Sequence, residues 1–382
     1  MCKELAMILQ SKHVWINEQF QPAQLEIENG KILNIYPYGF KEVTDDFDEY
    51  KVLPGLIDMH CHGFNGMDCN YVHREGFIHW MNSLPKEGVT SFLATTSTAP
   101  EENLLQSFAC IKKTITEYNE GAHCLGIHVE GPQISFDFKG AHNPYFIQKP
   151  SVEQFERYQD AASNIIKLIC IAPEMDVNHT LIKYCKNKGI KVTIGHTGAT
   201  YNECVLAAKD GAGSFTHTFN GMLGIHHREP GTAGAAMAMD DMYAELICDG
   251  VHVHYAVAKA VAKTKGKDRL ILITDAVQIK GLKPGIYETP NRWVEVKEDG
   301  CGRLKDGRLA GSSNKMITML KNCIQECGID EVTAINAATK NPATFLDLAD
   351  KGVLEKGKDA DILIIDNCFE VIQTYCRGKA YL

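Results

Sequence analysis

The sequence has no apolar run that approaches the length of a membrane span. A helix needs about 20 consecutive apolar residues to cross a bilayer, and no run in this 382-residue chain comes near that length. Blocks rich in Lys and Arg are also missing, and the formal net charge is −9. Because a basic surface is the signature of proteins that bind nucleic acid or anionic membranes, we expect neither as a partner. The composition does not exclude a local basic site that binds a single phosphate group.

Cysteine is plentiful, but the cysteine spacing of zinc fingers and redox motifs is missing. None of the 14 cysteines forms a C-x2-C pair, which argues against zinc-finger and redox motifs. The first residues, MCKELAMILQSKHVW, hold only a short apolar patch, which is too little for a secretory signal. We therefore expect a cytoplasmic protein whose cysteines are reduced core residues.

Eight short apolar runs recur in the middle of the chain and alternate with polar or amphipathic segments. The runs cover 52–60, 90–96, 124–132, 167–174, 191–197, 213–219, 244–250 and 269–276. Helical periodicity marks intervening segments that include 101–120, 152–162, 202–211 and 255–266. Continuous apolar strands are typical of a parallel sheet covered by helices. The pattern predicts an α/β fold with a closed (β/α)8 TIM-like barrel. An open doubly wound sheet is the alternative, and the absence of G-x-G-x-x-G after the first run weakens it.

The residue pattern at both ends of the chain is typical of short strands. Near the N-terminus, Asn29-Gly30 between alternating apolar positions is a strong hairpin signal. Neither end is large enough to bury a core of its own. We predict that residues 1–51 and 352–382 pair into one small discontinuous β-sandwich domain beside a barrel of residues 52–351. We also predict β-strands in the turn-rich segment that follows the eighth run.

Residues that bind metals stand at the carboxyl ends of five of the eight runs. The first run ends in VLPGLIDMHCHG, and on a strand its two histidines project the same way. In a barrel all these ends converge on the face that carries active sites. Each residue alone is also common as a loop or helix-capping residue, but together they predict a metal site. The residues are His60, His62, Glu130, His196, His217 and Asp275.

This ligand set suits a divalent ion and hydrolytic chemistry. Imidazole and carboxylate oxygens fit zinc, which we favour, as well as iron or manganese. Such an ion lowers the pKa of bound water from ~15.7 towards ~7 and polarises a carbonyl, which suits hydrolysis of an amide or a related C–N bond. The reaction also needs a carboxylate to move the proton from water to the leaving nitrogen. Asp275 is the candidate because it stands apart from Glu130, His196 and His217.

The pattern of strand-end ligands resembles the amidohydrolase superfamily. Within it, several segments together are similar to the family of deacetylases that act on N-acetylglucosamine 6-phosphate: HVEGP with KGAHNP, GHTGAT, THTFNGM, HHREPG, ICDGVH, LITDA and LAGSS. The likeness covers nearly the whole chain. It implies a (β/α)8 barrel with a small β-sandwich from both chain ends, usually as a homodimer, and an amino sugar phosphate as the small-molecule substrate.

The resemblance also implies roles for single residues. Glu130, His196 and His217 would hold the principal metal, His142 would help to polarise the acetamide carbonyl, and Asp275 would be the general base and then the general acid. Members of the family differ at the first-strand motif.

Because both its histidines are present here, His60 and His62 allow a second ion bridged through Glu130, so we expect one tight ion and a second of variable occupancy. Four further residues would meet the sugar phosphate, the last from the neighbouring subunit: Asn220, the Gly221 backbone, His252 and Arg228. Guanidinium and imidazole donors match phosphate oxygens well.

Three alternatives stay open. The segment LAGSSNKMITML resembles a shorter family segment with extra residues, so N-acetylgalactosamine 6-phosphate or another N-acyl amino sugar phosphate is an alternative substrate. A cyclic-amide hydrolase is the second alternative, although its relatives with paired metals commonly use a carboxylated lysine at the end of strand four, where Lys167 stands at the wrong end. The third is a scaffold without catalysis, which would be expected to lose ligands or Asp275.

Overall fold

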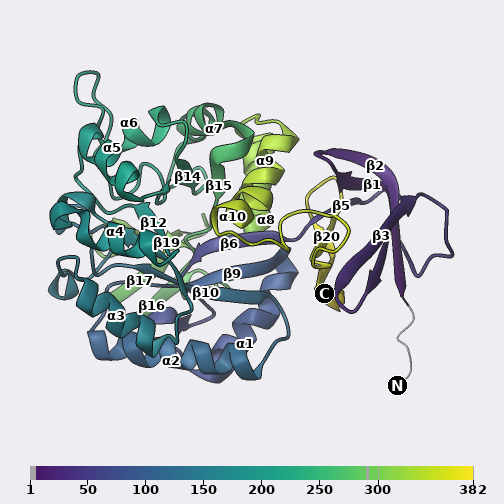
Figure 1. Cartoon of the computed structure of the whole chain (residues 1–382), viewed down its shortest axis with the longest axis horizontal. Helices are drawn as coiled ribbons and strands as arrows, with labels where there is room; N and C mark the ends of the chain where they lie inside the picture. The colour runs from purple at the N-terminus through teal and green to yellow at the C-terminus, as the bar shows by residue number, and fades with distance from the viewer. Residues whose placement is uncertain (1–5, 290–291, 300, 382) are drawn as a thin grey trace.

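The computed structural model describes residues 6–289, 292–299 and 301–381. A helix-covered barrel occupies one side, and a β unit built from both ends of the chain lies beside it (Figure 1). In these residues no helix combines the length and the apolarity that crossing a bilayer requires.

Eight parallel strands form the barrel, and they are hydrogen-bonded in chain order. They are β6 (Leu56–Cys61), β9 (Val89–Thr96), β10 (His123–Glu130), β11 (Ile166–Ile171), β12 (Lys191–Ile194), β13 (Ser214–Phe215), β14 (Tyr243–Leu246) and β15 (Leu270–Leu272). The barrel closes just beyond the regular strands, where Asp275 N–H donates to His60 O at 3.0 Å and His62 N–H donates to Ala276 O at 2.6 Å. The predicted barrel is confirmed, and its closure brings together two of the predicted site segments.

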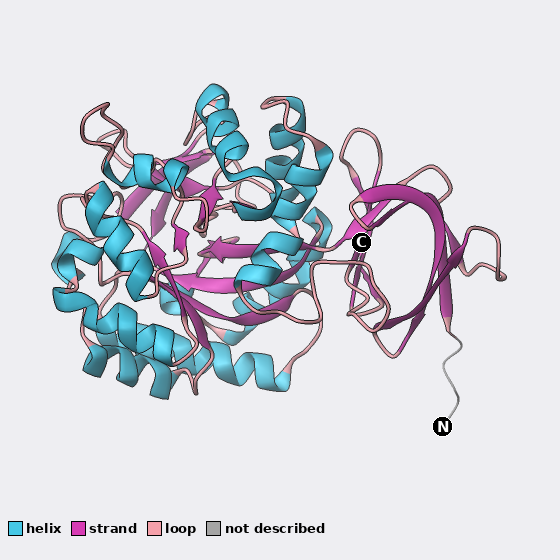
Figure 2. Cartoon of the chain, turned by 45° about the horizontal axis from the view of Figure 1, so that its top comes forward, coloured by secondary structure: helices cyan, strands magenta, loops and turns pink. Residues whose placement is uncertain are grey.

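The helices follow the strands in turn and surround the barrel (Figure 2). They are α1 (Arg74–Ser83), α2 (Glu101–Glu117), α3 (Val152–Ala161), α4 (Thr180–Asn187), α5 (Tyr201–Asp210), α6 (Gly231–Ala238), α7 (Tyr255–Arg269), α8 (Met316–Gln325), α9 (Glu331–Ala338) and α10 (Lys340–Phe345). All four segments with predicted helical periodicity are helical. Their apolar faces pack on the outside of the strands, as fully buried Phe108 and Phe155 illustrate.

The two chain ends share one sheet that curves around its own apolar cluster (Figure 2, right). Its order is β22-β21-β20-β5-β1-β2-β3, with β4 paired to β1. The strands are β1 (Met7–Ile16), β2 (Gln19–Glu28), β3 (Lys31–Pro37), β4 (Asp45–Asp46), β5 (Lys51–Pro54), β20 (Ile362–Ile365), β21 (Val371–Cys376) and β22 (Lys379–Tyr381). The predicted hairpin at Asn29-Gly30 is present, with φ of 52° and 75° at the two turn residues. Only Gly55 separates β5 from β6, so the chain passes from this sheet into the barrel without a linker.

A second antiparallel sheet is inserted between the last barrel strand and α8. It consists of β16 (Gly285–Thr289), β17 (Arg292–Val296), β18 (Cys301–Arg303) and β19 (Leu309–Ser312). A small ribbon of β7 (Gly63–Phe64) and β8 (Met67–Asp68) follows the first barrel strand. Val277, Ile279, Val294 and Ala310 pack between the inserted sheet and the end of the barrel, with Ala141 against them. The sheet therefore stands over the carboxyl ends of the barrel strands.

Candidate functional site

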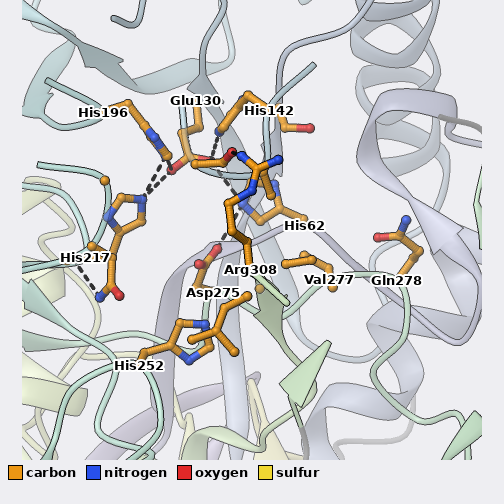
Figure 3. Close-up of a pocket in the computed structure, with 18 of the residues that line it drawn as sticks. His62, Glu130, His142, His196, His217, His252, Asp275, Val277, Gln278 and Arg308 are labelled. Carbon is orange, nitrogen blue, oxygen red and sulfur yellow. Dashed lines mark hydrogen bonds and ion pairs between the residues drawn. The ribbon is translucent and has the colours of Figure 1, made fainter. Parts of the chain in front are cut away.

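A cavity of about 290 Å³ opens at the carboxyl ends of the barrel strands (Figure 3). Most of the predicted site residues line it: His62, Glu130, His142, His196, His217, Asn220, Gly221, His252 and Asp275. His60 lies fully buried below them. Arg228 does not line the cavity.

Glu130, at the end of β10, is the centre of the site. Its Oε1 lies 2.9 Å from Nε2 of His217 and 3.2 Å from Nε2 of His196, and its Oε2 lies 3.3 Å from Nε2 of His62. Burial alone would raise the pKa of this carboxyl group, but the charges of His60 and His196 and the hydrogen bonds it receives hold that pKa well below its usual range. Glu130 therefore carries a buried negative charge that faces several imidazoles, as Figure 3 shows.

His196 and His217 form the first chelating group with Glu130. The Nδ1–H of His196 donates to the carbonyl oxygen of Phe138 at 2.9 Å, so Nε2 is the ring nitrogen that faces Glu130 and could bind a metal ion. Nε2 of His217 lies only 3.1 Å from Nε2 of His196. Two imidazole nitrogens that converge on one carboxylate fit the ligand set of a borderline divalent ion.

His60, His62 and Asp275 form a second group on the other side of Glu130. The Nε2 atoms of the two histidines are 3.3 Å apart, and Asp275 Oδ1 lies 3.1 Å from Nε2 of His62. Although burial raises the pKa of Asp275, the hydrogen bond with His62 and the charge of His60 lower it well below the usual value. Asp275 is thus ionised, and as a carboxylate it can bind a cation or accept a proton.

His142 differs from these histidines in its protonation. The backbone N–H of Thr98 donates to Nδ1 of His142 at 3.2 Å, so Nδ1 is the acceptor nitrogen and Nε2 carries the hydrogen. Burial, followed by the charge of His196, lowers the pKa of His142 to about 4, so the ring is neutral at pH 7. The Nε2–H of this neutral ring is a hydrogen-bond donor, and it lies 3.2 Å from Oε2 of Glu130.

The backbone is strained at three of the site residues. His196, His217 and Asp275 have φ values of +47°, +27° and +48°, a region that non-glycine residues rarely adopt. Such strain is concentrated at functional sites, where the surrounding structure holds it in place. At Gly221, φ is +54° and an added Cβ would lie 2.8 Å from Nδ1 of His196, so glycine lets this segment approach the imidazole.

His252 is oriented by a carboxylate behind it. Asp249 Oδ2 accepts Nδ1–H of His252 at 2.7 Å, and Asn314 Nδ2 donates to the same oxygen at 3.3 Å. Asn314 belongs to the unusual 311–320 segment, which connects β19 to α8. Nε2 of His252 is buried and has no partner among the described residues. It is available to a ligand in the cavity, as is the side of Asn220 that lines it.

Arg228 lies away from the cavity of its own chain. Residues 224 to 230 are all exposed, and Arg228 Nη1 is 2.7 Å from Nε2 of its neighbour His227. Among the lysines and arginines of the described segments, Arg308 is the one that lines the cavity. Its Nη1 donates to the carbonyl oxygen of Gly140 at 2.8 Å.

Sequence reasoning missed five residues in or behind the site: Thr98, His128, Glu245, Asp249 and Arg308. His128 had a signal, because it is two positions before Glu130 on one strand and so shares its face. Its ring is fully buried 4.7 Å from that of His60, and burial lowers its pKa well below the usual value. Asp249 contacts His252 only three positions away. Thr98, Glu245 and Arg308 act through contacts with residues far away in the sequence, and no local pattern marks them.

Comparison with known proteins agrees with this geometry. A model of the amidohydrolase family matches residues 51–381. N-acetylglucosamine-6-phosphate deacetylase of Bacillus subtilis (strain 168) is 38% identical to this chain, covering 95% of it and 93% of the relative. N-acetylgalactosamine-6-phosphate deacetylase of Escherichia coli O157:H7 is 31% identical, covering 96% and 95%.

Solved structures give the same result over the full length. A variant of N-acetyl-D-glucosamine-6-phosphate deacetylase from Mycobacterium smegmatis, in complex with N-acetyl-D-glucosamine-6-phosphate, superposes with a TM-score of 0.93 at 29% identity and covers 99% of each chain. The chain therefore belongs to the amidohydrolase family.

Proposed function

We propose that this protein is a metal-dependent deacetylase that hydrolyses N-acetylglucosamine 6-phosphate to glucosamine 6-phosphate and acetate. The observation that carries the proposal is the buried Glu130 between two groups of imidazoles, with ionised Asp275 beside it. The similarity to deacetylases of this substrate over nearly the whole chain supports it.

The donor set fits a divalent cation. Glu130 and Asp275 bring two buried negative charges together, and a divalent ion is the partner that such carboxylates and imidazoles share. Glu130, His196 and His217 would hold the principal ion, and His60 and His62 together with Glu130 would hold a second ion. Zinc is our preferred metal. When bound, such an ion activates water and polarises a carbonyl oxygen.

Two side chains of the protein stabilise the developing charge and transfer the proton. Nε2–H of His142 donates to the acetamide carbonyl oxygen of the substrate and stabilises the charge that develops there. Asp275 accepts the proton of the attacking water and then delivers it to the leaving amine. The inserted sheet forms part of the cavity wall through Leu309 and Ala310 of β19.

We assign the phosphate end of the substrate to three residues of the cavity wall and to one residue of a neighbouring subunit. Nε2 of His252, Asn220 and the backbone of Gly221 bind it from within the chain. Arg228 binds it from the neighbouring subunit of a homodimer, an assignment that its exposed position supports.

We propose a cytoplasmic location, because each cysteine that the structure describes is a free thiol and free thiols suit a reducing compartment. Lys167 is exposed at the beginning of β11 and does not line the cavity, so it offers no support for the cyclic-amide alternative.

The decisive experiment measures acetate release by the purified, zinc-loaded protein. The substrates are N-acetylglucosamine 6-phosphate, its galactosamine epimer and unphosphorylated N-acetylglucosamine. We expect fast release from the first and slow release from the unphosphorylated sugar.

Faster release from the epimer would support the same reaction but identify N-acetylgalactosamine 6-phosphate as the substrate, as in the name of the Escherichia coli relative. No release from any of the three would reject the proposed function.

A further inference from the structure

We propose that Glu245 is a positioning residue that fixes the ring orientation and the tautomer of His60 and thereby decides whether the second ion binds. This inference rests on the metal sites of the proposed function, and its main readout is metal content.

The contact between the two side chains is direct and fully buried. Glu245 lies on β14 and is 0% exposed, as is His60 on β6. Its Oε2 lies 2.9 Å from Nδ1 of His60. The same Oε2 also accepts the backbone N–H of His217, which identifies it as an acceptor, so Nδ1 of His60 holds the hydrogen between the two side chains.

With the hydrogen on Nδ1, Nε2 is the ring nitrogen of His60 that would bind a metal ion. That atom faces the second group of ligands, 3.3 Å from Nε2 of His62, 3.3 Å from Oε1 of Glu130 and 3.5 Å from Oδ1 of Asp275. A carboxylate behind a ligating histidine fixes the tautomer and raises the basicity of the ligand nitrogen, and its loss typically costs 10- to 100-fold in metal affinity.

Glu245 is itself held in place by the neighbouring strand. Its Oε2 also accepts the backbone N–H of His217 at 3.3 Å, and its backbone carbonyl accepts N–H of Thr218 at 2.8 Å. Its Oε1 has no partner within the described part of the chain. The side-chain hydrogen bonds of Glu245 are thus made to His60 and to the backbone of His217, which are both proposed metal ligands.

The first test compares zinc content after equilibrium dialysis against buffered free zinc. Wild type is expected to bind both ions. Glu245→Gln has the same shape but no charge, and we expect it to keep the principal ion and to bind the second about 10- to 100-fold more weakly. His62→Ala serves as the reference for a protein with the second site disabled.

Glu174→Gln is the matched control. Glu174 follows β11 and accepts hydrogen bonds from Thr197 Oγ1 and Gly198 N, and it contacts no imidazole of the cavity. We expect this variant to bind both ions as wild type does. Equal second-ion affinity in Glu245→Gln and wild type, or loss of both ions in Glu245→Gln, would overturn the proposal.

A second measurement needs no variant. In zinc-loaded wild type, two-dimensional proton–nitrogen spectra of the histidine rings should show His60 with its hydrogen on Nδ1. A hydrogen on Nε2, or wild type that binds a single ion at saturating zinc, would overturn the proposal. Failure of acetate release with both ions bound would instead reject the proposed function and leave the role of Glu245 standing.

Discussion

The backbone N–H of Thr98 donates to Nδ1 of His142, and this one contact sets His142 apart from the other histidines of the cavity. A backbone amide has no lone pair to offer at that position, so the ring nitrogen must accept. His142 therefore presents Nε2–H as a donor, whereas His196, whose Nδ1–H donates to a carbonyl oxygen, presents Nε2 as the nitrogen that can bind a metal ion.

His142→Ala should lower kcat by about 10²- to 10³-fold, the usual cost of losing one donor to a developing negative charge. Zinc content should stay unchanged, because the residue is a donor and not a ligand. Steady-state kinetics and elemental analysis on the same preparation check both statements. His142→Gln keeps an N–H donor and should retain more activity than His142→Ala, and loss of zinc in either variant would contradict the assignment.

Asp275→Asn should lower kcat by about 10²- to 10⁴-fold, since the amide cannot accept the proton of water. The principal ion should be retained, because Glu130, His196 and His217 are untouched. The measurement is acetate release together with metal content. A rate near that of wild type would remove Asp275 from the mechanism and favour a scaffold without catalysis.

Arg228→Ala should raise KM for the phosphorylated substrate about tenfold to a hundredfold, the range expected for a lost charged hydrogen bond. KM for the unphosphorylated sugar should change little. Mixing Arg228→Ala with Asp275→Asn gives a sharper test, because a hybrid dimer contains one site with an intact Asp275 and the partner's arginine. We expect partial recovery of activity in the mixture, and no recovery would argue against a shared site.

The Asp249–His252 pair should produce a pH dependence of substrate binding. Burial lowers the pKa of His252, but the hydrogen bond and the charge of Asp249 outweigh it and raise that pKa above the usual value. The ring is therefore a cation at and below its usual pKa and loses its charge as pH rises through the raised pKa, so KM for the phosphorylated substrate should increase there. Asp249→Asn should move this increase to lower pH, as a KM profile would reveal, while an unchanged profile would contradict the pairing.

Removal of the metal should affect stability as well as activity. Dialysis against a chelator should abolish acetate release and lower Tm, because an ion that binds the folded state stabilises it and its removal takes that stabilisation away. Adding zinc at about 100 times its Kd should restore about 2.7 kcal/mol of stability. Thermal unfolding with and without zinc checks this, with magnesium as a control ion that prefers oxygen ligands.

The barrel and its metal-binding edge could be predicted because both leave regular traces in the sequence. Apolar runs at a repeating spacing mark the strands, and a residue such as Glu130 or His217 directly after a run must lie at the shared edge. The pairing of Asn29-Gly30 with its flanking strands could be predicted for the same reason, since the turn chemistry is local.

The supporting contacts could not be predicted because nothing local encodes them. Glu245 reaches His60 across 185 positions of sequence, and Thr98 reaches His142 across 44. The positive φ values at His196 and Asp275 are likewise imposed by packing around residues whose own preference is for other conformations. The extra residues of the 311–320 segment gave no hint that Asn314 would contact Asp249.

The inserted sheet between β15 and α8 has a consequence for how such an enzyme changes over time. Every proposed metal ligand lies on the barrel edge, whereas β19 contributes Leu309 and Ala310 to the wall of the same cavity. Substitutions in β16 to β19 can therefore reshape the space for a sugar without moving an ion. New sugar specificities can therefore arise in this inserted stretch while the hydrolytic chemistry of the barrel edge is preserved.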